Sequence, residues 1–132
     1  LVARKMMDGG DAAYRLLDEI EAQAEEARAN LPNLAEPVWS AAESLRETTE
    51  WLVAQDLQER FSGATDYLRA FARVLGAHYH LKAAMSEETA GARTALARFY
   101  ITRLLPEHTS LLAAVRVGAD GLFDLSPDDL VA

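Results

Sequence analysis

Apolar residues recur at helical spacing along most of the chain, and the clearest stripe lies between residues 64 and 85. The apolar positions there advance in steps of four and three, so they return to one side of a helix every seven residues. A helix with so broad an apolar side has to be covered by other helices, which predicts a bundle. The stripe consists of Tyr67, Phe71, Val74, His78, Leu81 and Met85, with Leu68 and Leu75 on one flank.

Two further helices are predicted before this segment. The first begins near Asp11, which can cap it, and ends near Asn30, just before a Leu-Pro-Asn break. Its outer side is rich in glutamate, so we expect one side to face the bundle and the other to face solvent. The inner side carries Ala13, Leu16, Leu17, Ile20, Ala24 and Ala27.

The second of these helices spans about residues 33–61 and ends at a Ser-Gly break. Asn33 and Glu36 have the spacing of a capping box, and Pro37 is tolerated in a first helical turn. Its inner positions include a repeat of seven residues and are Val38, Ala41, Ala42, Leu45, Thr48, Thr49 and Leu52.

A fourth helix follows, with Ser86 as its expected cap and Glu87 and Glu88 in its first turn, where carboxylates match the positive end of the helix dipole. Pro106 must kink or interrupt this helix, because proline lacks an N–H and clashes with the preceding turn. Before the proline, the expected inner side is Ala92, Ala95, Leu96, Phe99 and Tyr100. The pattern resumes after it at Leu111, Leu112, Val115 and Ala119. The residues expected to end the helix and to open one last short turn are Gly118, Gly121, Ser126 and Pro127.

No run of alternating apolar and polar residues predicts a strand. The expected fold is therefore all-α: an up-and-down antiparallel four-helix bundle whose fourth helix is kinked or broken at Pro106. Residues 1–132 are expected to form a single helical domain, since this length is typical of one domain. The chain opens on Leu1 without an initiator methionine, so we expect it to be the C-terminal part of a longer protein.

The composition narrows the class of partner. The formal net charge is −8, and a field of this sign repels phosphate backbones, which argues against nucleic acid. The apolar runs are far shorter than the roughly 20 residues that a membrane-spanning helix needs. The absence of cysteine excludes disulfides and thiolate metal sites, and it is compatible with the cytoplasmic location that we expect.

Histidine is the first candidate for chemistry. His78 and His80 lie on one helix, where an H-x-H pair directs its two rings about 200° apart, so both cannot face one metal ion. We expect His78 to be a packed core residue and His80 a surface residue, unless a carboxylate reaches them across the bundle. Di-iron bundles need Glu-x-x-His motifs, and no glutamate precedes any histidine at that spacing. No metal, cofactor or catalytic residue is assigned in this chain.

Three other groups of side chains are weighed in the same way. Four acids of the first helix are expected on its solvent side: Glu19, Glu21, Glu25 and Glu26. Five aromatic residues fit core filling better than a ligand pocket: Tyr67, Phe71, Tyr79, Phe99 and Tyr100. Six basic residues either pair with glutamates on neighbouring helices or meet another domain's acidic surface: Arg69, Arg73, Lys82, Arg93, Arg98 and Arg103.

The order of several short motifs resembles the C-terminal extension of one branch of the acyl-CoA dehydrogenase family. Residues 67–77 read YLRAFARVLGA and residues 95–106 read ALARFYITRLLP, and a VRVGA segment follows at 115–119. Residues 8–10 and 49–52 are also similar to that extension. The chain departs from the branch at Ala72, where glycine is common, at residues 78–80, and in its acidic tail from 120 to 129.

The resemblance implies a parent flavoprotein that uses FAD to remove hydrogens from the alpha and beta carbons of an acyl-CoA and passes electrons to an electron-transfer flavoprotein. The branch includes enzymes similar to methylthio-propionyl-CoA dehydrogenases. The family's catalytic and flavin-contacting residues precede this extension, so none is carried onto this chain. The extension would pack against the catalytic body or a neighbouring subunit of a homo-oligomer.

The expected contacts with such a partner are exposed apolar residues, namely Trp39, Trp51, Phe61 and Phe123. A different class of function also fits the sequence: a stand-alone helical interaction or ligand-binding module.

Overall fold

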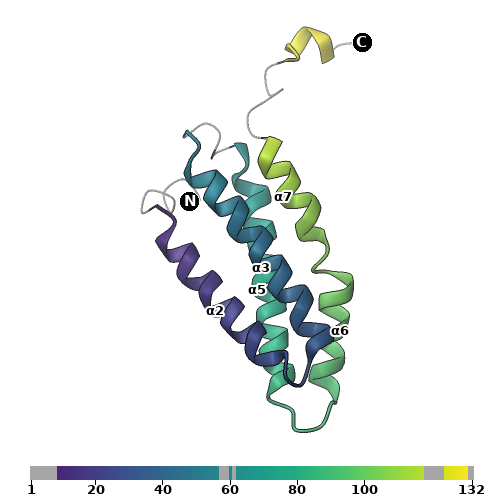
Figure 1. Cartoon of the computed structure of the whole chain (residues 1–132). Helices are drawn as coiled ribbons and strands as arrows, with labels where there is room; N and C mark the ends of the chain where they lie inside the picture. Colours follow the sequence, from purple (N-terminus) through teal and green to yellow (C-terminus); the bar gives the residue numbers. More distant parts are fainter. Residues whose placement is uncertain (1–8, 57–59, 61, 118–123, 131–132) are drawn as a thin grey trace.

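The computed structural model describes residues 9–56, 60, 62–117 and 124–130, and every regular element among them is helical. The helices are α2 (Asp11–Ala27), α3 (Pro32–Val53), α5 (Ala64–Met85), α6 (Ala92–Arg103), α7 (Glu107–Val117) and the short 3-10 helix η2 (Pro127–Leu130). Figure 1 shows α2, α3, α5 and the bent pair α6–α7 lying alongside one another as an up-and-down bundle. The predicted all-α four-helix fold is confirmed. No helix of the described ranges is long and apolar enough to cross a membrane.

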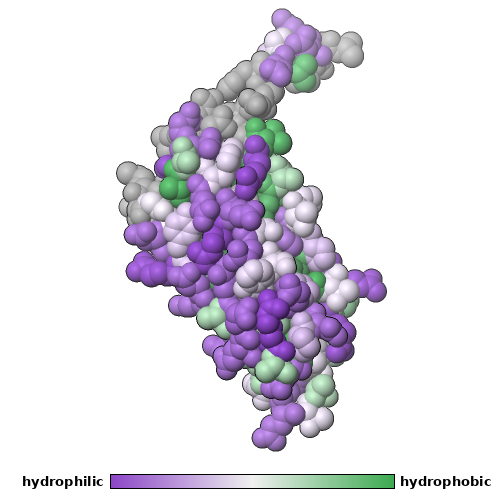
Figure 2. Space-filling view, viewed as in Figure 1, coloured by the Kyte–Doolittle hydropathy of each residue, from purple (hydrophilic) through white to green (hydrophobic). Residues whose placement is uncertain are grey.

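The core lies between α3 and α5 and is closed on its two sides by α2 and by α6–α7. The predicted inner side of α3 is buried at all seven positions, from Val38 to Leu52. Alanines occupy much of the core on α2, α3 and α5, which lets the helix backbones approach closely. Figure 2 shows that the outer surface over α2 and α3, which faces away from the core, is mostly hydrophilic, as the sequence pattern predicts.

The predicted start of α2 at Asp11 is confirmed, whereas the predicted caps of α2 and α3 are wrong. Gly10 precedes α2 in a left-handed conformation with φ of 82°, and Asp11 lies in the first turn instead of capping it. α3 begins at Pro32, not at an Asn33 cap, because the fixed φ of proline suits the first helical position and its missing N–H is not needed there. The Leu31 carbonyl accepts bonds from the amides of Leu34 and Ala35, at 3.1 and 2.9 Å.

The predicted end of α3 near Phe61 is also wrong, since the helix ends at Val53. The Arg60 side chain folds back on this end: its Nη2 donates to the Val53 carbonyl at 2.7 Å and its Nε to the Leu52 carbonyl at 3.3 Å. A cation that satisfies the last carbonyls is a favourable C-terminal cap. Phe61 itself lies outside the described residues.

The break at Pro106 is confirmed. α6 ends at Arg103 and α7 begins at Glu107, with a turn between them. The amides of Leu104 and Leu105 both donate to the Tyr100 carbonyl, at 2.8 and 2.9 Å, so the last turn widens to include an i→i−5 bond before the proline.

The predicted last short turn is also confirmed, as η2, where the Ser126 amide and hydroxyl donate to Asp129 Oδ2 at 2.8 and 3.0 Å. The expected helix end at Gly118 and Gly121, and Ala119 of the inner stripe, lie outside the described residues.

A close approach between helices joins α5 to α6. The Tyr100 hydroxyl donates to the Arg73 carbonyl at 3.0 Å, and its ring crosses Gly76. A Cβ at Gly76 would lie 2.1 Å from the Tyr100 oxygen and 2.5 Å from Cζ. Glycine is therefore required at position 76 by space and not by backbone conformation.

Candidate functional site

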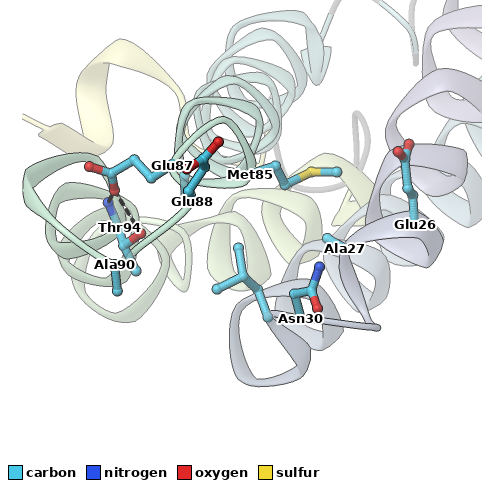
Figure 3. A pocket seen from close by; sticks show the side chains of 10 residues that line it. Glu26, Ala27, Asn30, Met85, Glu87, Glu88, Ala90 and Thr94 are labelled. Atoms are coloured by element: carbon cyan, nitrogen blue, oxygen red, sulfur yellow. Dashed lines mark hydrogen bonds between the residues drawn. The ribbon is translucent and has the colours of Figure 1, made fainter.

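A hollow of about 450 Å³ opens at the end of the bundle, where α2 turns into α3 and α5 turns into α6 (Figure 3). Glu26 and Asn30 line it from one side, and Met85, Glu88 and Thr94 line it from the other. Apolar side chains complete the lining: Ala27, Leu31, Ala84 and Ala90. With two exposed carboxylates on its rim, the hollow can receive a small apolar or cationic group, whereas an anion would be repelled.

Glu87 also borders this hollow, but its carboxylate turns toward the start of α6 (Figure 3). Glu87 Oε1 accepts from the Thr94 amide at 2.7 Å, the Thr94 hydroxyl at 2.8 Å and the Gly91 amide at 3.2 Å. The Thr94 side chain, more than any other group, holds the pKa of Glu87 below its usual range. Glu87 is therefore a helix cap and not a free base.

This arrangement corrects the predicted cap of the fourth helix. Ser86 ends α5, where its hydroxyl donates to the Ala83 carbonyl at 2.6 Å, and α6 begins only at Ala92. The expected match between an acid and the positive end of the helix dipole does occur. It reaches the first turn of α6 from the preceding loop, because the carboxylate of Glu87 is long enough to accept amides several residues ahead.

His78 is the packed core histidine that the sequence predicts, with 7% of its surface exposed. Gln23 of α2 crosses to it: Gln23 Nε2 lies 3.1 Å from His78 Nδ1 and donates to the His78 carbonyl at 2.8 Å. Burial lowers the pKa of His78, with a smaller contribution from the Lys82 charge, so the neutral ring is favoured in the fold. The ring serves as a polar link between α2 and α5.

The other two histidines lie elsewhere. His80 is half-buried, and its ring stacks on Tyr100 of α6 with 4.8 Å between centroids, so it is less exposed than expected. His108 Nδ1 lies 2.6 Å from the Leu105 carbonyl at the bend between α6 and α7. Among the described residues, no cluster of three or more histidines and acids could hold a metal ion.

The five aromatic residues divide between core and surface. Tyr67 is buried, and its hydroxyl lies 2.7 Å from Thr49 Oγ1, while burial raises the pKa of Tyr67 to about 12. Phe71 and Tyr100 pack partly buried against the core, as expected. The prediction is wrong for Tyr79 and Phe99, which are 57% and 58% exposed.

One of the four acids of the first helix is not on its solvent side. Glu21 is paired with Arg46 of α3, whose Nε and Nη2 each donate to one Glu21 oxygen at 3.0 Å. Both side chains are mostly covered, with about a fifth of their surface exposed, and Asp18 adds a third bond to Arg46 at 2.7 Å. Glu19, Glu25 and Glu26 are exposed, as predicted.

Of the six basic residues, Arg69 and Arg73 pair with a glutamate on a neighbouring helix, which is the first of the two alternatives that the sequence leaves open. Arg69 and Arg73 donate to the two oxygens of Glu107 on α7, at 2.8 and 3.1 Å. Arg93 donates to the Ser86 hydroxyl at 2.8 Å. Exposed side chains without an ion pair to any described residue are Lys82, Arg98 and Arg103.

The two tryptophans are half-buried rather than exposed. Trp39 lies beneath the Arg28 guanidinium, 5.5 Å from the ring centroid, and Trp51 lies beneath that of Arg116, at 5.9 Å. These cation–π contacts cover the rings at the two ends of α3, so the tryptophans close the bundle, as their positions predict. Phe61 and Phe123, the other expected contacts, lie outside the described residues.

The outward side of α6 is the surface that the sequence pattern placed inside. The helix carries two apolar stripes, and the buried one consists of small or branched residues: Thr94, Ala97 and Ile101. The larger side chains Leu96 and Phe99 point outward and are 56% and 58% exposed. Ala92, Leu96 and Phe99 belong to the stripe that the sequence predicted to lie inside. The buried residues Thr94, Ala97 and Ile101 follow helical steps of three and four, and a search for a second stripe would have found them.

These features define a helical bundle domain with an apolar, basic helix on one side and a hollow with an acidic rim at one end. Residues 16–126 match the family model described as acetyl-CoA dehydrogenase C-terminal like. The match covers α2 from residue 16 onward and the whole of α3, α5, α6 and α7, and the chain belongs to this family. Comparison with curated proteins and with solved structures gave no match.

Proposed function

We propose that this chain is the accessory C-terminal helical domain of an FAD-dependent acyl-CoA dehydrogenase. The observation that carries the proposal is the family match over residues 16–126. The parent enzyme would remove hydrogens from the alpha and beta carbons of an acyl-CoA thioester and pass electrons to an electron-transfer flavoprotein. This domain would support assembly by packing against the catalytic body or a neighbouring subunit of a homo-oligomer in the cytoplasm.

Two hollows of the described residues carry carboxylates that do not suit FAD. The cofactor carries a diphosphate, and the hollow at the bundle end carries the carboxylates of Glu26 and Glu88 on its rim. A second hollow, between α2 and α5, is lined by both Glu19 and Glu26. The proposal therefore places FAD and the catalytic groups in the part of the parent that precedes residue 1, and assigns no step of the reaction to this domain.

Two measurements test the proposal. The gene upstream of Leu1 should encode several hundred in-frame residues of a flavoprotein, and the protein made from the whole gene should show flavin absorbance and oxidise acyl-CoA. A start codon close to Leu1 would instead favour a stand-alone interaction or ligand-binding module. If the 132-residue chain alone bound FAD or turned over acyl-CoA, the accessory role would be wrong.

A further inference from the structure

We propose that the outward side of α6 is the surface by which this domain docks on the catalytic body, at a site that combines apolar residues with carboxylates. We call this surface the α6 face and define it by Ala92, Leu96, Phe99 and Arg103; Arg98 borders it on the flank that faces the turn between α2 and α3. The identity of the partner rests on the proposed function. The position of the surface and the chemistry of what covers it rest on the contacts of α6 itself.

The geometry of α6 separates its two sides clearly. Thr94, Ala97 and Ile101 point into the bundle and are almost fully buried. Leu96 and Phe99 lie on the opposite side and leave more than half of their surface exposed. Neither Leu96 nor Phe99 is needed to fill the core, because the buried side of α6 is formed without them. Outward apolar residues at helical spacing are the anchors by which a helix inserts into a groove of a partner.

The charges of α6 specify the partner further. The helix contains three arginines and no acidic residue, in a chain whose formal net charge is −8. Glu107 forms an ion pair with both Arg69 and Arg73 on the neighbouring α5, whereas Arg98 and Arg103 form no ion pair with any described residue. Guanidinium groups beside an apolar stripe favour a partner that offers carboxylates around an apolar centre.

A second copy of the chain is a poorer partner. Pairing α6 with α6 of another copy would bring like charges together around the two-fold axis. Pairing α6 with the acidic outer side of α2 in another copy is a head-to-tail contact, which does not close into a dimer. A membrane surface is also disfavoured, because the negative charge of the whole chain opposes anionic lipid.

Hydroxyl-radical footprinting of the full-length holoenzyme tests the α6 face. Tyr79 on α5 is as exposed as Phe99 in this domain and serves as the internal reference. We expect Phe99 and Leu96 of the wild-type holoenzyme to be oxidised several-fold more slowly than the same residues in a full-length variant carrying R98E and R103E. Tyr79 should be oxidised equally in the two proteins. The matched charge reversal R15E, on the exposed side of α2, should leave Phe99 protected.

The contrary outcomes are distinct. Equal oxidation of Phe99 and Tyr79 in a holoenzyme that binds FAD and turns over acyl-CoA would overturn the docking surface and leave the proposed function intact. Protection that disappears on dilution would indicate a second copy, and protection that needs vesicles of anionic lipid would indicate a membrane; either result overturns the proposal. A full-length protein without flavin would instead contradict the proposed function.

Discussion

Helices α2 and α6 lie on opposite sides of the bundle in Figure 1 and divide their apolar residues in opposite ways. α2 buries Leu17 and Ile20 and exposes acids. α6 buries Ala97 and Ile101 and exposes Leu96 and Phe99 between arginines. The large apolar residues of α2 therefore contribute to folding, whereas Leu96 and Phe99 on α6 contribute little to it and are available for binding.

The two helices are also anchored differently. α2 is held to α3 by an ion pair, Arg46 with Glu21, and to α5 by Gln23. α6 is held to α5 by the ring of Tyr100 across Gly76, and its first turn is fixed by Glu87. The acidic helix is therefore positioned by an ion pair and an amide side chain, and the basic helix by an aromatic ring over a glycine and by a capping carboxylate. Five changes test this comparison.

The largest effect is expected for Leu17→Ala, matched with Leu96→Ala. Leu17 is fully buried, and removing a buried leucine side chain costs roughly 2–5 kcal/mol of unfolding free energy. Leu96 is mostly exposed, so its substitution should change the unfolding free energy by less than about 0.5 kcal/mol. Urea unfolding of both variants measures the difference. Equal losses would mean that α6 packs the other way round.

Gly76→Ala should destabilise the bundle by about 1–3 kcal/mol, because its Cβ would overlap the Tyr100 ring. The sign of this change in unfolding free energy is informative, since alanine in an unhindered helix is about 1 kcal/mol more favourable than glycine. In a Tyr100→Ala background the same substitution should become stabilising. A double-mutant cycle from thermal or urea unfolding separates the two effects. A stabilising Gly76→Ala with Tyr100 present would rule out the close approach.

Arg46→Met should cost about 1–3 kcal/mol, since it leaves the partly buried Glu21 carboxylate without its two N–H donors. Adding Glu21→Leu should recover much of that loss, because an uncompensated charge is no longer buried. Arg15→Met, on the exposed side of α2, is the control and should be nearly neutral. If Arg46→Met matched the control, the ion pair would not hold α2.

Glu87→Ala should loosen the start of α6 without unfolding the bundle. The amides of Gly91, Arg93 and Thr94 lose their acceptor, so native-state hydrogen exchange at Thr94 should accelerate. Glu88→Ala removes the neighbouring carboxylate, which caps nothing among the described residues, and should leave exchange at Thr94 unchanged. Equal acceleration in both variants would indicate general electrostatics in place of a cap.

The smallest effect concerns the link between α2 and α5. Burial lowers the pKa of His78 from 6.5, so the unfolded chain takes up its proton before the folded chain does as the pH falls. The contribution of neutral His78 to the stability of the fold is therefore complete above pH 6.5. It is lost progressively as the pH falls from 6.5 to the lowered pKa. Urea midpoints measured above and below pH 6.5 should differ less in His78→Gln than in the wild type. An unchanged difference would assign the pH dependence to other groups.

The sequence by itself determined the helices, because helical periodicity, glycine breaks and proline are local properties. The stripe of residues 64–85 predicts α5 with its bounds, and Pro106 predicts the bend between α6 and α7. The sequence also predicts the buried side of α3 and the burial of His78. The family resemblance in residues 67–77 and 95–106 agrees with the family match over residues 16–126.

Only the tertiary structure decided which stripe of α6 turns inward. Both stripes have helical spacing, and the sequence reading favoured the larger side chains. The space beside α5 is too narrow for them, because the Tyr100 ring already fills the gap over Gly76, so the small stripe at Ala97 is the one that packs. The pairing of Glu21 with Arg46 and the capping by Glu87 likewise join residues whose distance in space no local pattern encodes. The same packing that rejects Leu96 and Phe99 from the core leaves them on the surface, where a partner can reach them.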